Sequence, residues 1–377
     1  MYLLPKPKTI KEQDGQMLLC HSTHIVMTKE VAETEMHAAK RLQEAIRQET
    51  GLILPFSVGE VREGDLSLGI AKTLPEQTYE ITIDEKGGQI SGGDGAGVLY
   101  GVETFCQIVQ QCGGILPCVQ IQDAPDMPNR GYYFDQTRGR VLKLEELKKI
   151  ADRMCRYKLN QLQLYVEHTY LFRDFSEMWR DQTPLTAEEI RELDSYCRER
   201  HIELVPSLAS FGHLCTLLST KTYGDLCEME DSWKEPFSFW NRMRYHTINV
   251  SDERSLPLIK KMIAEYMQLF SSNKFNICAD ETFCLGKYKS KKLAEERGVH
   301  RLYIDYVKEL AQFLVENGKI PMFWGDIIWN SPELMKELPE SMICLNWGYA
   351  PEQREDETRA IAQTGAVQYL LSLIHIS

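Results

Sequence analysis

Strand and helix signals alternate over residues 131–370, and this alternation constrains the fold of the chain most. Short apolar runs separated by amphipathic stretches are the pattern of a parallel sheet covered by helices. The predicted strands are residues 131–134, 161–166, 202–207, 275–279, 320–324, 342–347 and 366–370. The predicted helices are residues 144–157, 186–200, 256–270, 302–316 and 352–363. About seven strands without a dinucleotide-binding fingerprint favour an α/β fold of the (β/α)8 barrel type, incomplete in this chain, over an open sheet.

Residues 1–123 mix short strand-like runs with two helices, which indicates a small α+β domain. The helices are predicted at residues 29–50, ended by Gly51, and 96–111; the strands are predicted at 65–71, 79–83 and 89–91. Residues 123–131 are rich in Pro, Gly, Asp and Asn, which are typical of a linker. We therefore predict an α+β domain at residues 1–123 and a barrel domain at residues 124–370.

Charge and cysteine usage exclude several classes of partner. The formal net charge is -12, so a nucleic-acid backbone would be repelled. None of the eleven cysteines forms a CxxC pair, so no metal is expected, and free cysteines are typical of a reducing compartment. We find no basic segment followed by an apolar core of about 7–15 residues. No run reaches about 18 apolar residues. We expect a cytoplasmic protein without a membrane partner.

Two short segments need separate interpretation. The GGDGAG sequence at residues 92–97 does not fit the GxGxxG spacing of nucleotide-binding loops, and we interpret it as a loop leading into a helix. The last seven residues, LSLIHIS at 371–377, interrupt the seventh strand and match a translated sequencing adapter. We predict that this tail is non-native, that the gene fragment is truncated, and that the fragment as written is inactive or poorly folded.

Polar and aromatic side chains gather at the carboxyl ends of the predicted strands, where barrel enzymes place their active sites. They are Asp135, Arg138, Glu167, His168, His213, Asp280, Glu281, Trp324, Asp326, Trp347 and Tyr349. Indoles stack on the apolar faces of sugar rings, and carboxylates and guanidinium groups bind hydroxyls. The set therefore indicates a carbohydrate site.

The adjacent acids Asp280 and Glu281 are the most informative pair. Neighbouring residues of a strand point to opposite faces, but both can reach one cavity if the backbone turns at the strand end. A carboxyl kept protonated there by burial and by its neighbour's charge can act as a general acid. A bare Asp-Glu dipeptide is more often a buried structural pair or a helix cap, so the assignment depends on the surrounding sequence.

Five segments resemble the strands of glycoside hydrolase family 20. The segment FNICADETF at residues 275–283 resembles the catalytic strand of that family, and RGYYFDQTR at 130–138 resembles the first strand, with Asp135 and Arg138 at matching positions. Residues 157–164, 203–213 and 323–326 resemble the second, third and fifth strands. The order holds over about 240 residues. The α+β domain resembles the family's N-terminal companion domain.

The resemblance implies a β-N-acetylhexosaminidase that removes terminal β-linked N-acetylglucosamine or N-acetylgalactosamine from an oligosaccharide with retention. Glu281 would be the general acid and base, and Asp280 would hold the acetamido N–H while the substrate's own carbonyl oxygen attacks the anomeric carbon. Neither a cofactor nor a protein nucleophile is needed in this oxazolinium route.

The resemblance also implies substrate-binding roles for five residues. Arg138 would bind the ring hydroxyls, and His213 would lie near the acid–base network. Trp324 and Trp347 would enclose the acetamido group, and Tyr349 would donate to its carbonyl. Many family members carry two aspartates where this chain has Glu167 and His168, so the roles of these two residues stay open.

Two alternatives remain. A non-catalytic sugar-binding barrel would keep the tryptophans but lose the acids, and both acids are present here. A glycosidase with a protein nucleophile would need a second carboxylate at about 5–5.5 Å from the acid, and Asp326 is the visible candidate.

Overall fold

The computed structural model describes residues 1–236, 238–348, 362–365 and 367–372, in two units. The first unit comprises residues 1–132, 145–162 and 195–203, and the second unit comprises residues 133–144, 163–194 and 204–377. Two segments of the predicted barrel, residues 145–162 and 195–203, therefore group with the first unit, although the domain boundary was predicted near residue 123.

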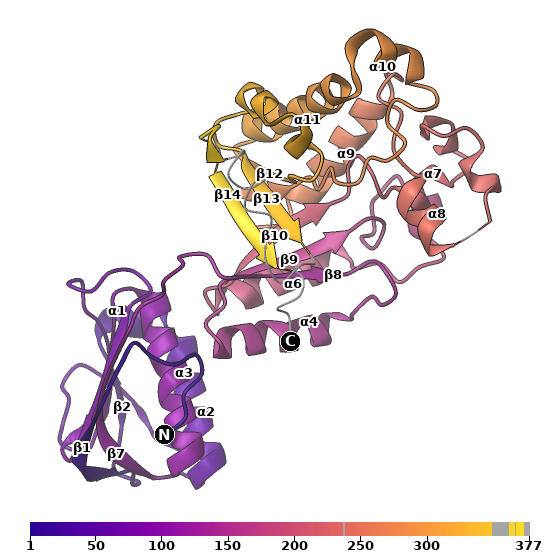
Figure 1. The fold of residues 1–377 in the computed structure, drawn as a ribbon. Helices are drawn as coiled ribbons and strands as arrows, with labels where there is room; N and C mark the ends of the chain where they lie inside the picture. The colour runs from indigo at the N-terminus through magenta and orange to yellow at the C-terminus, as the bar shows by residue number, and fades with distance from the viewer. Residues whose placement is uncertain (237, 349–361, 366, 373–377) are drawn as a thin grey trace. The chain divides into compact units, whose positions relative to one another are not determined.

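A seven-stranded mixed sheet forms the N-terminal part (Figure 1). Its strands are β1 (Thr9–Leu18), β2 (Ile25–Met27), β3 (Phe56–Val58), β4 (Leu66–Ile70), β5 (Tyr79–Asp84), β6 (Gly87–Gly92) and β7 (Ile115–Asp123). The spatial order is β1-β7-β5-β6-β4-β2-β3, with β5 antiparallel to both β6 and β7 and with β2 parallel to β3 and β4. Strands β4, β5 and β6 were predicted from the sequence, and the other four strands were not.

Helices α2 (Met36–Thr50) and α3 (Gly95–Cys112) pack against each other and lie beside this sheet in Figure 1. A single helix at residues 29–50 was predicted, and this was wrong: α1 (Lys29–Thr34) ends before Glu35, which has φ -121° and ψ 27°. The break places the buried Glu35 carboxylate 2.8 Å from His201 Nε2, a contact that helical periodicity does not reveal. At residues 92–97 the structure confirms a loop entering a helix, because Asp94 caps α3 by accepting the Gly97 N–H.

The second sheet has seven strands in sequence order and curls as part of a barrel (Figure 1). They are β8 (Gly131–Asp135), β9 (Gln161–Val166), β10 (Glu203–Leu208), β11 (Lys274–Asn276), β12 (Ile320–Trp324), β13 (Ile343–Gly348) and β14 (Val367–Ser372). Adjacent strands from β10 to β14 pair in parallel. The predicted barrel architecture is therefore confirmed in the described residues. Strand β14 extends to Ser372, two residues into the predicted tail.

The helices that follow these strands begin and end close to the predicted residues. They are α4 (Leu144–Arg156), α6 (Ala187–Arg198), α9 (Ser255–Met267) and α11 (Val299–Glu316), whereas α10 (Lys291–Arg297) was not predicted. Helix α11 packs against β12 and α9. The long connections after β9 and β10 contain short helices that the sequence analysis did not predict: α5 (Ser176–Trp179), α7 (Cys215–Leu218) and α8 (Phe239–Arg244). The predicted helix at 352–363 falls mostly outside the described residues.

None of the helices in the described part of the chain is both long enough and apolar enough to cross a membrane.

Candidate active site

The chain turns sharply after β11, and this turn delivers two adjacent carboxylates to one pocket. Cys278, Ala279 and Glu281 have φ values of 58°, 64° and 48°, in the left-handed region that non-glycine residues rarely adopt. Strand β11 therefore ends at Asn276, three residues earlier than predicted. The turn removes the alternation of a strand, and both Asp280 and Glu281 line the same pocket, as the sequence analysis expected.

Hydrogen bonds from three neighbouring elements hold this strained turn. Asn276 Oδ1 accepts the Cys278 N–H at 2.8 Å, Ser210 Oγ donates to the Ile277 carbonyl at 2.6 Å, and Tyr303 Oη donates to the Ala279 carbonyl at 3.0 Å. Such conformations persist only where the surroundings fix them, and they concentrate at functional sites.

The loop after β10 approaches the turn closely and brings a histidine to it. A Cβ on Gly212 would lie 2.6 Å from the Asp280 carbonyl oxygen, so only glycine fits at this position. The next residue, His213, also has a left-handed φ of 59°. Its Nε2 atom lies 3.4 Å from Asp280 Oδ2 and 3.3 Å from Glu281 Oε2. The imidazole is buried and bridges the two carboxylates.

The charges of His213 and Asp280 shift each other's pKa. Burial alone would lower the pKa of His213, but the charge of Asp280 and hydrogen bonds to Asp280 and Glu281 outweigh it and raise the pKa to about 10. Burial disfavours the charged form of Asp280, yet the charge and hydrogen bond of His213 prevail and lower the pKa of this carboxyl. The structure therefore favours a protonated imidazole beside an ionised Asp280.

Several polar atoms of the cluster are buried without a hydrogen-bond partner among the described residues. They include Asp280 Oδ1, His213 Nδ1 and Asp326 Oδ1. Because a buried polar atom normally finds a partner, each of these atoms is a position where a ligand or water can bind. The other oxygen of Asp326 accepts the Glu281 N–H at 3.0 Å. Burial, followed by the charge of Asp280, raises the pKa of Asp326 to about 8.

Arg138 and Asp135, from the end of β8, form the second polar group of the pocket. Arg138 Nε donates to Asp135 Oδ2 at 2.6 Å, and Asp135 Oδ1 accepts the N–H groups of Thr137 and Arg138 at 2.9 Å. The guanidinium lies 4.7 Å from the ring centroid of Tyr165. Asp135 and the aromatic ring fix the orientation of Arg138, which lines the pocket.

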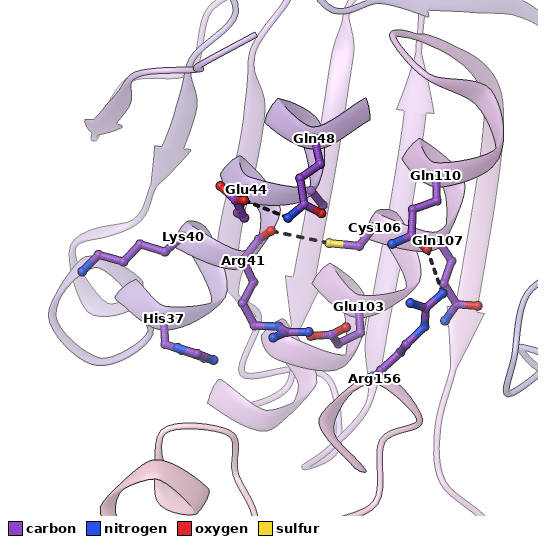
Figure 2. A pocket seen from close by; sticks show the side chains of 11 residues that line it. His37, Lys40, Arg41, Glu44, Gln48, Glu103, Cys106, Gln107, Gln110 and Arg156 are labelled. Atoms are coloured by element: carbon purple, nitrogen blue, oxygen red, sulfur yellow. Dashed lines mark hydrogen bonds and ion pairs between the residues drawn. The ribbon is translucent and has the colours of Figure 1, made fainter. Parts of the chain in front are cut away.

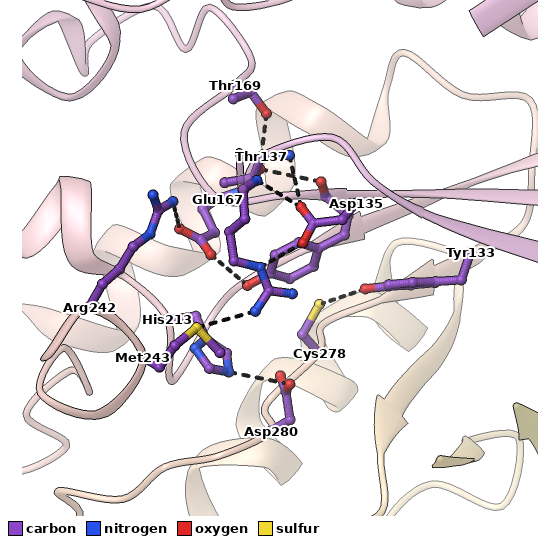
Figure 3. A network of polar contacts seen from close by, with 12 residues as sticks. Tyr133, Asp135, Thr137, Glu167, Thr169, His213, Arg242, Met243, Cys278 and Asp280 are labelled. Carbon is purple, nitrogen blue, oxygen red and sulfur yellow. Dashed lines mark hydrogen bonds and ion pairs between the residues drawn. The ribbon is translucent and has the colours of Figure 1, made fainter. Parts of the chain in front are cut away.

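Glu167 and His168 lie behind the pocket wall, and neither lines the pocket. Figure 3 shows Glu167 facing Arg242, whose Nη2 donates to Glu167 Oε2 at 3.0 Å; Tyr165 Oη donates to the other oxygen at 2.9 Å. His168 Nδ1 lies 3.2 Å from Thr216 Oγ1, and burial lowers the pKa of this imidazole to about 4. The contacts of Glu167 connect the end of β9 to helix α8.

The pocket has a volume of about 590 Å³ and is lined by residues of the second unit. Its lining comprises Tyr133, Asp135, Arg138, Tyr165, Phe239, Trp240, Met243, Arg244, Asp280, Glu281, Phe283, Trp324 and Trp347. The predicted residues Arg138, Asp280, Glu281, Trp324 and Trp347 therefore come together, with His213 directly behind the two acids. Tyr349 lies outside the described residues.

The part of the pocket that α8 and Phe283 contribute was not predicted from the sequence. The available signal was the Ser238 cap, whose Oγ accepts the Asn241 N–H, followed by two aromatic residues and two arginines. A six-residue helix is too short to give a clear amphipathic period. Within the described part of the chain, no group of three or more His, Cys, Asp or Glu side chains is arranged to hold a metal ion.

Comparison with known proteins assigns both parts of the chain. Residues 1–124 match the family model "Glycosyl hydrolase family 20, domain 2", and residues 128–371 match the model "Glycosyl hydrolase family 20, catalytic domain". A beta-hexosaminidase of Porphyromonas gingivalis is 24% identical over 86% of this chain and 45% of its own length. One from Vibrio furnissii is 26% identical over 74% of this chain and 48% of its own length. The chain spans less than half the length of either relative.

Solved structures show the same fold at low sequence identity. A mutant Streptomyces plicatus beta-hexosaminidase in complex with product (GlcNAc) superposes with a TM-score of 0.81 over 98% of this chain and 74% of its own, at 19% identity. A Flavobacterium johnsoniae chitobiase gives a TM-score of 0.81 over 98% of this chain and 59% of its own, also at 19% identity. The catalytic-domain model covers well over half of the sequence, so this chain belongs to glycoside hydrolase family 20.

Proposed function

We propose that the protein is an exo-β-N-acetylhexosaminidase that releases terminal N-acetylglucosamine or N-acetylgalactosamine with retention, through attack by the substrate's own acetamido group. The proposal rests on one observation above all. Asp280 is held beside a cationic His213 through Oδ2, while its Oδ1 is buried without a partner among the described residues. An acetamido N–H that donated to Oδ1 would satisfy this atom.

The two steps of the reaction follow from the positions of the acids. In the first step the acetamido carbonyl oxygen attacks the anomeric carbon and forms an oxazolinium ion. The glycosidic C–O bond breaks as Glu281 donates a proton to its oxygen, and the leaving group departs as an alcohol. Asp280 accepts the N–H and stabilises the positive charge that develops on the acetamido group. In the second step Glu281 takes a proton from water, which attacks the anomeric carbon and reopens the ring to give the retained sugar.

The other pocket residues support a pyranose ring in this position. Arg138, held by Asp135, would bind ring hydroxyls with its remaining N–H groups. Trp324 packs edge-on against Tyr133 at 5.0 Å between centroids, and with Trp347 it would enclose the acetamido methyl group. His213 would keep Asp280 ionised and oriented throughout the cycle.

The alternative with a protein nucleophile finds little support. Asp326 does not line the pocket, and one of its oxygens accepts the Glu281 N–H. Its raised pKa would leave it mostly neutral near pH 7, whereas a nucleophile must be ionised. A sugar-binding role without catalysis remains the other alternative, and hydrolysis of any N-acetylhexosaminide would exclude it.

A series of N-acyl substrates tests the acetamido route. With the longest chain that the gene encodes, we expect nitrophenyl glucosaminides to be hydrolysed ever more slowly as the acetyl methyl group gains one, two and three fluorine atoms. Fluorine withdraws electrons from the carbonyl oxygen and weakens it as a nucleophile. N-acetylglucosamine thiazoline should inhibit competitively. Rates that do not change along the series would overturn the proposal in favour of a protein nucleophile.

A further inference from the structure

Exposed aromatic side chains surround the outer part of the pocket, and folding alone does not account for them. Trp240 is 65% exposed, Phe239 is 59% exposed and Phe283 is 41% exposed, and all three line the pocket. Tyr133, Tyr165 and Trp324, by contrast, are intermediate or buried. A cluster of exposed aromatic rings at a polar site commonly marks a binding surface. We call Trp240, Phe283 and Arg244 the outer platform.

Arg244 links the two rings of the outer platform. Its guanidinium carbon lies 5.2 Å from the ring centroid of Trp240 and 5.9 Å from that of Phe283. Its backbone carbonyl accepts the thiol of Cys284 at 3.0 Å, so the end of α8 is attached to the loop that carries Glu281. The platform and the proposed general acid therefore belong to one connected piece of structure.

Charge pairing distinguishes Arg244 from the other charged groups of the pocket. Asp135 pairs with Arg138, and both Asp280 and Glu281 pair with His213. Arg244 has no carboxylate partner among the residues that the structure describes. An arginine that is partly stacked on aromatic rings presents N–H donors that match a carboxylate or a sulfate group.

The position of Glu281 indicates which part of the substrate contacts the outer platform. The acid that protonates the glycosidic oxygen must face the leaving sugar, and Phe283 follows Glu281 by two residues, its N–H donating to the Glu281 carbonyl at 2.7 Å. We propose that the outer platform is the binding site for the leaving sugar and that it favours one with an acidic substituent, such as a uronic acid. This inference rests on the proposed function and specifies its acceptor side.

Three substrates with the same terminal N-acetylglucosamine separate the contributions. They carry a methyl group, a neutral glucose or a glucuronate as the β-linked leaving group, and all three leave as poor alkoxides. For the longest chain that the gene encodes, we expect kcat/KM to rise from methyl to glucose by about two- to tenfold through ring stacking. A further rise of about two- to fivefold from glucose to glucuronate should diminish with added salt.

Variants then assign these gains to residues. Trp240→Ala should remove the gain from methyl to glucose, and Arg244→Gln should remove only the gain from glucose to glucuronate. Each should slow the methyl glycoside less than the disaccharide whose gain it removes. Tyr288→Ala provides the matched control, since Tyr288 is exposed on the same loop but does not line the pocket.

The two proposals fail in different ways. If the unmodified protein leaves all three glycosides intact, the proposed function is wrong. If it hydrolyses them with equal kcat/KM, or if Trp240→Ala slows the methyl glycoside as much as the disaccharides, the outer platform is not an acceptor site. If Arg244→Gln removed the rise in kcat/KM from the methyl glycoside to the glucose disaccharide, the proposed role of Arg244 in preferring an acidic leaving sugar would be contradicted.

Discussion

Each unit of the molecule buries a cluster of ionisable groups, and the two clusters are built differently. In the N-terminal unit, Arg41 on α2 donates to Glu103 on α3 (Figure 2), and the thiol of Cys155 donates to the same carboxylate. Glu103 is 3% exposed at the side chain and Arg41 is 26% exposed. The neighbouring pocket, about 360 Å³, is lined mainly by α2 and α3.

In the second unit the carboxylates outnumber the cations that reach them. Asp280 and Glu281 share His213, whose contact with Asp280 is drawn in Figure 3. Asp326 faces the Glu281 N–H without a cation of its own among the described residues. Burying a carboxyl group without a cation is costly and raises its pKa, as at Asp326, so proteins retain such groups mainly where chemistry needs them. We infer that complete pairing is typical of a structural cluster, whereas unequal pairing with unpartnered oxygens is typical of a reactive one.

The largest effect should follow from changing the acid of the reactive cluster. Glu281→Gln keeps the shape of the side chain but removes the proton, and we expect kcat/KM on the methyl glycoside to fall by about 10²–10⁴. The loss should be smaller for a nitrophenyl glycoside, because nitrophenolate leaves without full protonation. Steady-state kinetics on the two substrates measure the difference, with the thermal unfolding midpoint as a folding control. An equal loss on both would argue against general acid catalysis.

Disrupting the Arg41–Glu103 pair of the N-terminal unit should lower stability and leave activity unchanged. Glu103→Ala leaves Arg41 without its buried partner, and we expect the free energy of unfolding of the N-terminal unit to fall by about 3 kcal/mol. Denaturant titration measures this loss, while kcat at a temperature where the variant stays folded should be unchanged. The double variant Arg41→Met with Glu103→Leu serves as the control and should recover most of the stability, since apolar packing replaces the pair. A kcat that falls in the single variant would contradict the contrast between the clusters.

Local sequence predicted the regular elements well and the long-range contacts poorly. Strands β9 and β12 fall on the predicted residues because each is a short apolar run between breakers. The break at Glu35 and the early end of β11 depend on partners far away in the chain, namely His201 and Tyr303. The periodicity of a sequence reflects local structure and does not reveal such contacts.

The residues of the candidate site also fall into two groups, those that local sequence predicts and those whose positions depend on long-range contacts. Asp280, Glu281 and Trp324 follow strand ends, so their convergence on one pocket could be predicted from the barrel rule. The bridging position of His213 depends on the close approach of Gly212 to the turn, which no spacing reveals. The contribution of α8 depends on the Glu167–Arg242 ion pair, which joins residues 75 positions apart.

The smallest effect should come from Asp326, and it concerns pH rather than rate. Asp326→Asn keeps an acceptor for the Glu281 N–H, so kcat near pH 6 should change little. The pKa of Asp326 is raised by burial from 3.8 to about 8, so the folded state holds a proton that the unfolded state has released. Its contribution to stability is therefore fully present below pH 3.8 and is lost as the pH rises to about 8.

The asparagine side chain has no proton to lose in this pH range. The free energy of unfolding of the variant, relative to that of the parent, should therefore rise between pH 4 and pH 8 and stay constant above pH 8. His213, with its pKa raised from 6.5 to about 10, adds a decline above pH 6.5 that both proteins share. Denaturant titrations at several pH values measure the difference. A stability difference independent of pH would mean that Asp326 is ionised throughout. Asp280 and Asp326 would then both be ionised, with His213 beside Asp280 as the nearby cation.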